Sequence, residues 1–110
     1  MNFEIILTPN FEKEAKALQK KYPSFKSDLI ELITVLVKDP MIGVEVYKNC
    51  FKIRFPIKSK GKGKSGGGRL VICVRVMQEK IYLLSVFDKS EKENVTDAFL
   101  RQLLADLDEI

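Results

Sequence analysis

Two stretches of alternating side chains, separated by a glycine-rich loop, constrain the fold of this chain more than any other feature. In Val46–Ile57 the odd positions from 51 onward are apolar, and the basic residues stand at even positions. The alternation resumes at Arg69, with leucine, isoleucine and valine on one side and Arg69, Cys73 and Arg75 on the other. A period of two is typical of a strand with one buried face. The sequence therefore predicts a β-hairpin with one apolar face and one basic face.

Side-chain parity limits how these two strands can pair, because residues opposite one another must share a face. One permitted register places Arg54 opposite Arg69 and Cys50 opposite Cys73. The long loop does not fix this register by itself. We interpret the two cysteines as reduced packing residues, and a redox pair is the alternative that a cytoplasmic setting disfavours.

The flanking segments predict the rest of the fold. The pattern in Asn2–Leu7 and the apolar run Ile81–Phe87 predict strands, the second of them central. Helical spacing of apolar residues predicts two helices within Thr8–Pro23 and Ser24–Pro40, and a last helix after Thr96. We therefore expect an α+β fold in the order β-α-α-β-β-β-α. It would form one domain, residues 1–110, with a small, mixed, mainly antiparallel sheet, an N-terminal helical hairpin and a C-terminal helix.

Positive charge is concentrated in the middle of the chain. No acidic residue lies between Glu45 and Glu79, whereas the rest of the chain has ten bases against fifteen acids. The basic residues of this segment are Lys48, Lys52, Arg54, Lys58, Lys60, Lys62, Lys64, Arg69 and Arg75. A solvated surface usually mixes its signs, so this segment favours a polyanionic partner.

Several kinds of catalytic and cofactor site are excluded by composition. The chain has no histidine, which rules out a Ser-His-Asp triad, a Cys-His pair and a histidine-ligated zinc ion. Its two cysteines form no metal motif. Gly63-Lys64-Ser65 is not a phosphate-binding loop, because position 58 is lysine rather than glycine and a strand follows. We expect no metal, no small-molecule cofactor and no membrane, since no apolar run approaches ~18 residues and the first residues lack a signal-peptide pattern.

The basic residues fall into two candidate groups. Lys52, Arg54 and Arg69 lie on one predicted sheet face, where facing like charges are destabilising, which favours an anion site over a solvated face. The other group is expected to contact nucleic-acid phosphates, either from a mobile cationic loop or from the strand, although a role in solubility alone is the alternative. Its members are Lys48, Lys58, Lys60, Lys62, Lys64 and Arg75.

Four segments together resemble the RelE/HigB-type toxins of bacterial toxin–antitoxin pairs. They are Lys52-Ile53-Arg54, the three glycines before Arg69-Leu-Val, Ile81–Leu84 and Lys89–Val95. The resemblance implies a cytoplasmic mRNA interferase that cleaves mRNA in the decoding site of the ribosome, inhibits translation and is neutralised by an antitoxin. It also implies that the reacting phosphate is held by Lys52, Arg54 and Arg69, with Lys89 as a further basic residue.

The implied reaction is attack of a ribose 2′-hydroxyl on the adjacent phosphate. Lys52 or Lys89 would serve as base or acid, and Arg54 and Arg69 would stabilise the transition state. The tyrosine that orients the nucleophile in RelE is replaced by Val95. Two alternatives are a ParE-like toxin that inhibits DNA gyrase without nuclease activity, and an RNA-binding module of the same fold that is catalytically inactive.

Overall fold

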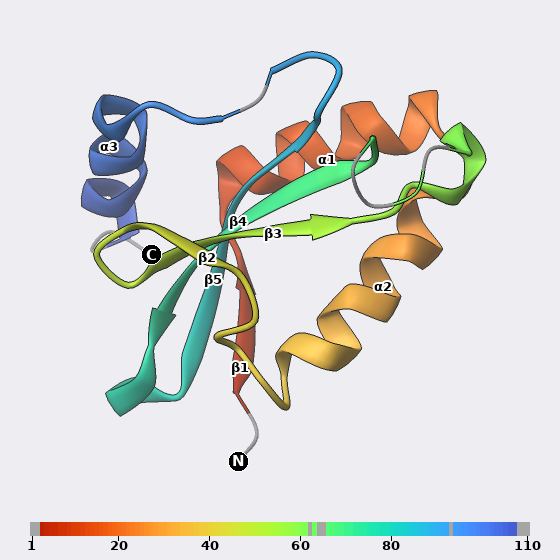
Figure 1. Ribbon diagram of the computed structural model, residues 1–110. Coiled ribbons are helices and arrows are strands. Elements are labelled where there is room, and N and C mark those ends of the chain that lie inside the picture. Colours follow the sequence, from red (N-terminus) through yellow and green to blue (C-terminus); the bar gives the residue numbers. More distant parts are fainter. Residues whose placement is uncertain (1–2, 62, 64–65, 93, 108–110) are drawn as a thin grey trace.

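The computed structural model describes residues 3–61, 63, 66–92 and 94–107, and these residues form three helices and a five-stranded sheet. The elements are β1 (Glu4–Leu7), α1 (Pro9–Lys21), α2 (Phe25–Leu36), β2 (Val44–Tyr47), β3 (Cys50–Phe55), a 3-10 turn η1 (Lys58–Lys60), β4 (Gly68–Arg75), a 3-10 turn η2 (Val76–Gln78), β5 (Lys80–Asp88) and α3 (Asp97–Leu107). The strand order is β1-β5-β4-β3-β2, with β1 parallel to β5 and every other pair antiparallel (Figure 1). The α+β class, the mixed sheet and the positions of the helices are confirmed.

One predicted strand is in fact two. A turn at Lys48 and Asn49 divides Val46–Ile57, so that β2 folds back on β3 and becomes the edge of the sheet. Asn49 has a φ of 61°, a left-handed conformation that asparagine tolerates better than most residues. The Glu45 carboxylate accepts a hydrogen bond from the Asn49 backbone N–H at 3.1 Å. Lys48 therefore lies in a turn rather than on a strand face, which corrects the sequence prediction.

The predicted register of the central hairpin is confirmed. Cys50 lies opposite Cys73, and Arg54 lies opposite Arg69. The Val74 backbone N–H donates to the Asn49 carbonyl at 2.9 Å, next to the cysteine pair, which makes Cys50 and Cys73 a non-hydrogen-bonded pair. The same pattern returns every two residues, so the arginines also form a non-hydrogen-bonded pair. In such pairs the Cα atoms are about 4.5 Å apart and the side chains are close.

The two N-terminal helices lie within the predicted ranges, but α2 ends at Leu36, four residues before Pro40. The Thr8 hydroxyl caps α1 by accepting from the Phe11 N–H at 3.3 Å, and Pro9 occupies the first helical turn. Pro23 follows α1 and ends it. Neither of these helices nor α3, within the described residues, is long and apolar enough to cross a membrane.

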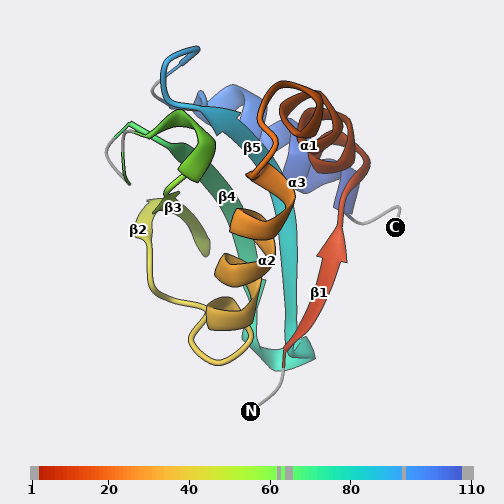
Figure 2. The ribbon, with the colours of Figure 1, turned by 90° about the vertical axis from the view of Figure 1, so that its right-hand side faces the viewer.

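Helices cover both faces of the sheet (Figure 2). The first face packs against α1 and α2 through a core that includes Leu70, Ile72 and Val74 of β4. The second core lies on the opposite face and joins Val71 and Cys73 of β4 to the α3 residues, among them Leu100, Leu103 and Leu107. α3 packs on part of the sheet face that was predicted to be basic. That part of the face is apolar, because its side chains pack against the leucines of α3. The cations of this face are confined to its remainder.

Candidate functional site

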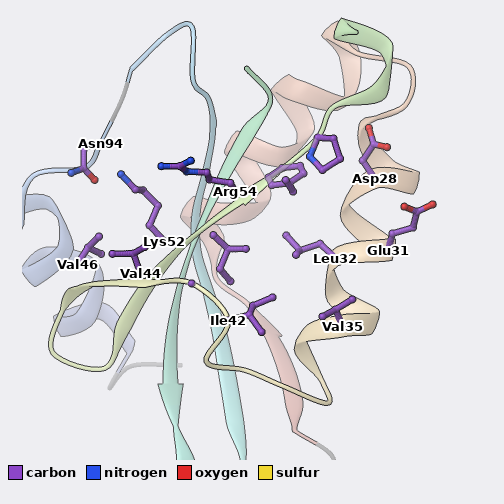
Figure 3. A pocket seen from close by; sticks show the side chains of 14 residues that line it. Asp28, Glu31, Leu32, Val35, Ile42, Val44, Val46, Lys52, Arg54 and Asn94 are labelled. Atoms are coloured by element: carbon purple, nitrogen blue, oxygen red, sulfur yellow. The ribbon is translucent and has the colours of Figure 1, made fainter. Parts of the chain in front are cut away.

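Lys52 and Arg54 of β3 line a cleft of about 790 Å³ between α2 and the β2–β3 edge of the sheet (Figure 3). Asn94, just before α3, lines the same cleft. Asp28 and Glu31 of α2 line the cleft as well. The intervening lining is apolar, from Leu32, Val35, Ile42, Val44 and Val46. The cleft thus combines cations from the sheet with an apolar wall and carboxylates from the helix.

Arg54 and Arg69 bring two guanidinium groups to neighbouring positions on the same face. Arg54 is exposed, and in the described part of the chain its side chain has no hydrogen bond or ion pair. Arg69 is only 5% exposed, and its guanidinium donates to the Gly68 carbonyl at 2.9 Å. Facing like charges are destabilising in a sheet. The pair therefore places two guanidinium groups side by side on one face of the sheet, and Arg54 is the one open to a ligand.

Burial of Arg69 is a correction to the expectation of an open basic face. Phe87 of β5 lies opposite Arg69, and the ammonium of Lys92 stands 4.9 Å from the centre of the Phe87 ring. Arg69 therefore lies between β3 and β5, where little solvent reaches it. The cations that line the cleft are Lys52, which is half-buried, and Arg54.

Lys89 lies at the same end of the sheet as the arginine pair. Its backbone N–H donates to the Gly67 carbonyl at 3.1 Å, and Gly67 is two residues before Arg69. The side chain is half-buried. The structure therefore brings the backbone of Lys89 to the predicted site.

Lys48 and Arg75 lie at the opposite end of the hairpin. Lys48 precedes the start of β3 and is six residues from Arg54. Arg75 ends β4 and is six residues from Arg69. At roughly 3.3 Å per residue, the six residues of β4 from Arg69 to Arg75 span about 20 Å, and the four residues of β3 from Cys50 to Arg54 span about 13 Å. The Arg75 guanidinium stacks over the Tyr82 ring at 5.3 Å. These two residues do not belong to the cluster around the arginine pair.

Two of the four loop lysines, Lys58 and Lys60, pair with carboxylates, which corrects the prediction of mobile cations for these two residues. The Lys58 ammonium lies 3.0 Å from the Glu31 carboxylate, and its backbone N–H donates to Asp28 at 2.9 Å. The Ser59 backbone N–H donates to the Ser24 hydroxyl, which in turn donates to the Ser59 hydroxyl. These hydrogen bonds hold η1 against the start of α2. Lys62 and Lys64 lie outside the described residues.

Lys60 is buried rather than exposed. Its side chain is 8% exposed and its ammonium lies 2.5 Å from Asp88, whose side chain is fully buried. The Tyr22 hydroxyl and the Ser90 backbone N–H also donate to the Asp88 carboxylate. Burial alone would raise the pKa of Asp88, but the hydrogen bonds from Lys60, Tyr22 and Ser90 hold it well below the usual aspartate range. Lys60 therefore neutralises a buried carboxylate and is not available to a phosphate.

Sequence reasoning missed Asp88 and Asn94. A carboxylate directly after the apolar run Ile81–Phe87 is the signal that could have identified Asp88, because a carboxylate that is buried with the end of such a strand needs a partner. Asn94 carries no comparable pattern. In the described residues no group of three or more cysteine, aspartate or glutamate side chains could hold a metal ion.

The architecture matches solved structures of a bacterial toxin. A double arginine-to-alanine mutant of the E. coli toxin RelE in the free state aligns with a TM-score of 0.63 and 16% identity, over 96% of this chain and 97% of that chain. This chain has the RelE fold. The isolated E. coli RelE toxin aligns with a TM-score of 0.54, 15% identity and coverage of 96% and 98%. The RelE mutant in complex with an antitoxin RelBc peptide gives 0.60, 20% identity and coverage of 86% and 100%.

The comparison confirms the fold that the resemblance to RelE/HigB-type toxins implied. No protein-family model matches the chain. Val95 is buried in the core beneath α3.

Proposed function

We propose that this protein is a toxin that cleaves mRNA on the ribosome and is neutralised by an antitoxin. The observation that carries the proposal is the pairing of Arg54 with Arg69 on one face of β3 and β4, with Lys52 two residues away on the same face. The RelE fold, shared with a known toxin, supports this assignment.

The proposed reaction needs positive charge from the protein, but it needs no nucleophile from the protein. The 2′-hydroxyl of the substrate attacks its own phosphate, so the protein must bind the phosphate, stabilise the phosphorane and assist two proton transfers. Arg54 can bind the phosphoryl oxygens through its planar guanidinium and cannot be deprotonated. Arg69 adds a second fixed positive charge beside it, and Lys52 or Lys89 moves protons. The ribosome supplies alignment of the mRNA, which is worth several orders of magnitude in rate.

An antitoxin peptide is the proposed protein partner. A RelE structure in complex with an antitoxin RelBc peptide supports this choice. The cleft provides a surface for such a partner, because Val35, Ile42 and Val44 are 50%, 38% and 66% exposed there. Neighbouring exposed apolar side chains mark protein interaction sites. The proposed substrate, the ribosome and the antitoxin are cytoplasmic, and we place the protein there.

Arg54→Ala tests the proposal, with Lys48→Ala as the matched control on the same hairpin. Both residues are exposed, but only Arg54 lies at the site. In a reconstituted translation reaction, 5′-end mapping of the mRNA should show cleavage by the wild-type protein and by Lys48→Ala. Arg54→Ala should lower the cleavage rate by about 10²–10³-fold, the usual loss when a preorganised charge stabiliser is removed.

Each other result contradicts part of the proposal. Full cleavage by Arg54→Ala would show that the reaction does not use this site. Growth arrest by the wild-type protein with DNA damage and intact mRNA would favour the gyrase inhibitor. Salt-dependent RNA binding without cleavage or toxicity would identify the inactive RNA-binding module.

A further inference from the structure

The two cysteines meet at the end of the hairpin that lies away from the arginine pair. Cys50 is fully buried and Cys73 is 4% exposed. They lie directly opposite one another in a non-hydrogen-bonded pair, flanked by the hydrogen bond from Val74 to the Asn49 carbonyl. Such pairs hold their Cα atoms about 4.5 Å apart. A disulfide accepts Cα separations of roughly 4.4–6.8 Å, so the backbone need not move for the two sulfurs to bond.

The surroundings of the pair make the two thiols unequal. A hydrogen bond from the Cys50 thiol and the nearby Arg75 guanidinium lower the pKa of Cys73 to about 7. The same hydrogen bond, together with burial, raises the pKa of Cys50. The thiolate is the reactive form of cysteine, and a neighbouring arginine favours it. Cys73 is therefore the nucleophile of the pair, and Cys50 is the thiol that completes the bond.

We propose that Cys50 and Cys73 are a modification site, at which a hydroperoxide forms a reversible disulfide between β3 and β4. The Cys73 thiolate attacks one peroxide oxygen, the O–O bond breaks, and Cys73 becomes a sulfenic acid while hydroxide leaves. The Cys50 sulfur then attacks the Cys73 sulfur, the S–S bond forms and the sulfenic oxygen leaves as water. With hydrogen peroxide as oxidant, two thiols and one peroxide give one disulfide and two waters.

The site differs in place from the proposed phosphate site and does not depend on it. Cys50 is four residues from Arg54 along β3, and Cys73 is four residues from Arg69 along β4. The second core covers the pair through α3, so oxidant enters when this region opens locally, or from the side of half-buried Arg75. An inactive toxin would carry the same site.

The test uses the reduced full chain and hydrogen peroxide as the probe. Intact mass spectrometry of the wild-type protein should show the loss of two hydrogen atoms, with a monomeric mass and full reversal by a phosphine reductant. Peptide mapping without reduction should link the segment containing Cys50 to the segment containing Cys73. The rate should rise with pH, with a midpoint near the pKa of Cys73, about 7.

Two single variants identify the nucleophile. In Cys50→Ser the serine hydroxyl can still donate to Cys73, so a sulfenic acid should form and be trapped by dimedone. In Cys73→Ser the remaining Cys50 thiol is fully buried, and burial keeps its pKa raised, so trapping should be slower by at least about tenfold. Both variants keep a side chain of similar size, and circular dichroism confirms that they fold.

Three outcomes would overturn the proposal. The first is unchanged wild-type mass under conditions that fully oxidise free glutathione. The second is a disulfide between two molecules in place of the internal one. Equal dimedone trapping of the two variants would overturn the assignment of Cys73 as the nucleophile.

Discussion

Lys60→Met should destabilise the protein strongly, because it removes the cation from a buried ion pair. The Lys60 side chain is 8% exposed and Asp88 is fully buried, so methionine leaves in the interior a carboxylate that keeps its hydrogen bonds from Tyr22 and Ser90 but has lost its ion pair. Breaking a buried pair from one side costs about 3–5 kcal/mol. For a domain of this size that corresponds to a fall in Tm of about 12–20 °C.

The loss should depend on pH in a defined direction. In the wild-type protein the lowered pKa of Asp88 means that this group stabilises the fold above its unfolded pKa of about 3.9, and that this contribution is lost as the pH falls below that value. Without the ammonium of Lys60, burial of Asp88 raises its pKa. The difference in stability between wild type and Lys60→Met should therefore be greatest near neutral pH and should shrink toward pH ~4.

Urea unfolding followed by circular dichroism measures both effects. Lys58→Met is the matched control, because Lys58 makes an exposed pair with Glu31 in the same turn, and exposed pairs contribute little. Adding Asp88→Asn to Lys60→Met removes the unpaired charge and should restore part of the stability. Equal stability of Lys60→Met and Lys58→Met, or a difference that does not change with pH, would refute the buried pair.

Three further results are expected. Thr8→Val should lower the stability by about 1–2 kcal/mol in urea unfolding, because the Thr8 hydroxyl both caps α1 and donates to a buried carbonyl of β5 at 2.8 Å; an unchanged midpoint would contradict this. Gly67→Ala should destabilise the hairpin, because a Cβ there would stand 2.3 Å from the Phe55 carbonyl oxygen, and calorimetry should show a lower Tm than for the wild-type protein. The Cys50–Cys73 disulfide should raise the stability by about 3 kcal/mol, because it closes a loop of some twenty residues in the unfolded chain; equal urea midpoints of the oxidised and reduced forms would argue against it.

The hairpin could be predicted from sequence because two independent constraints agree there. Alternation defines the faces of β3 and β4, and the parity of facing side chains leaves few registers. Arg54 opposite Arg69 was among them, and the structure has that register. The division of the first strand was not predicted, because extending the alternation of residues 51–57 back to Val46 passes over Asn49, a polar residue at an odd position, where the chain in fact turns.

The basic cluster was predicted only in part, because sequence does not show which charges are neutralised across the fold. Glu31 is twenty-seven residues from Lys58, and Asp88 is twenty-eight residues from Lys60, yet each lies within an ion-pair distance in the structure. Burial of Arg69 likewise depends on Phe87 of another strand. A segment without acidic residues can therefore still lie next to carboxylates from other segments once the chain has folded.

The parallel pairing of β1 with β5 affects how the protein is made. Glu4 pairs with Lys80 and Leu7 with Leu83, so β1 has no neighbour in the sheet until β5 leaves the ribosome. Contacts between such distant segments form late, because the intervening chain must first be closed into a loop. The sheet of the nascent chain therefore stays incomplete until β5 has been synthesised.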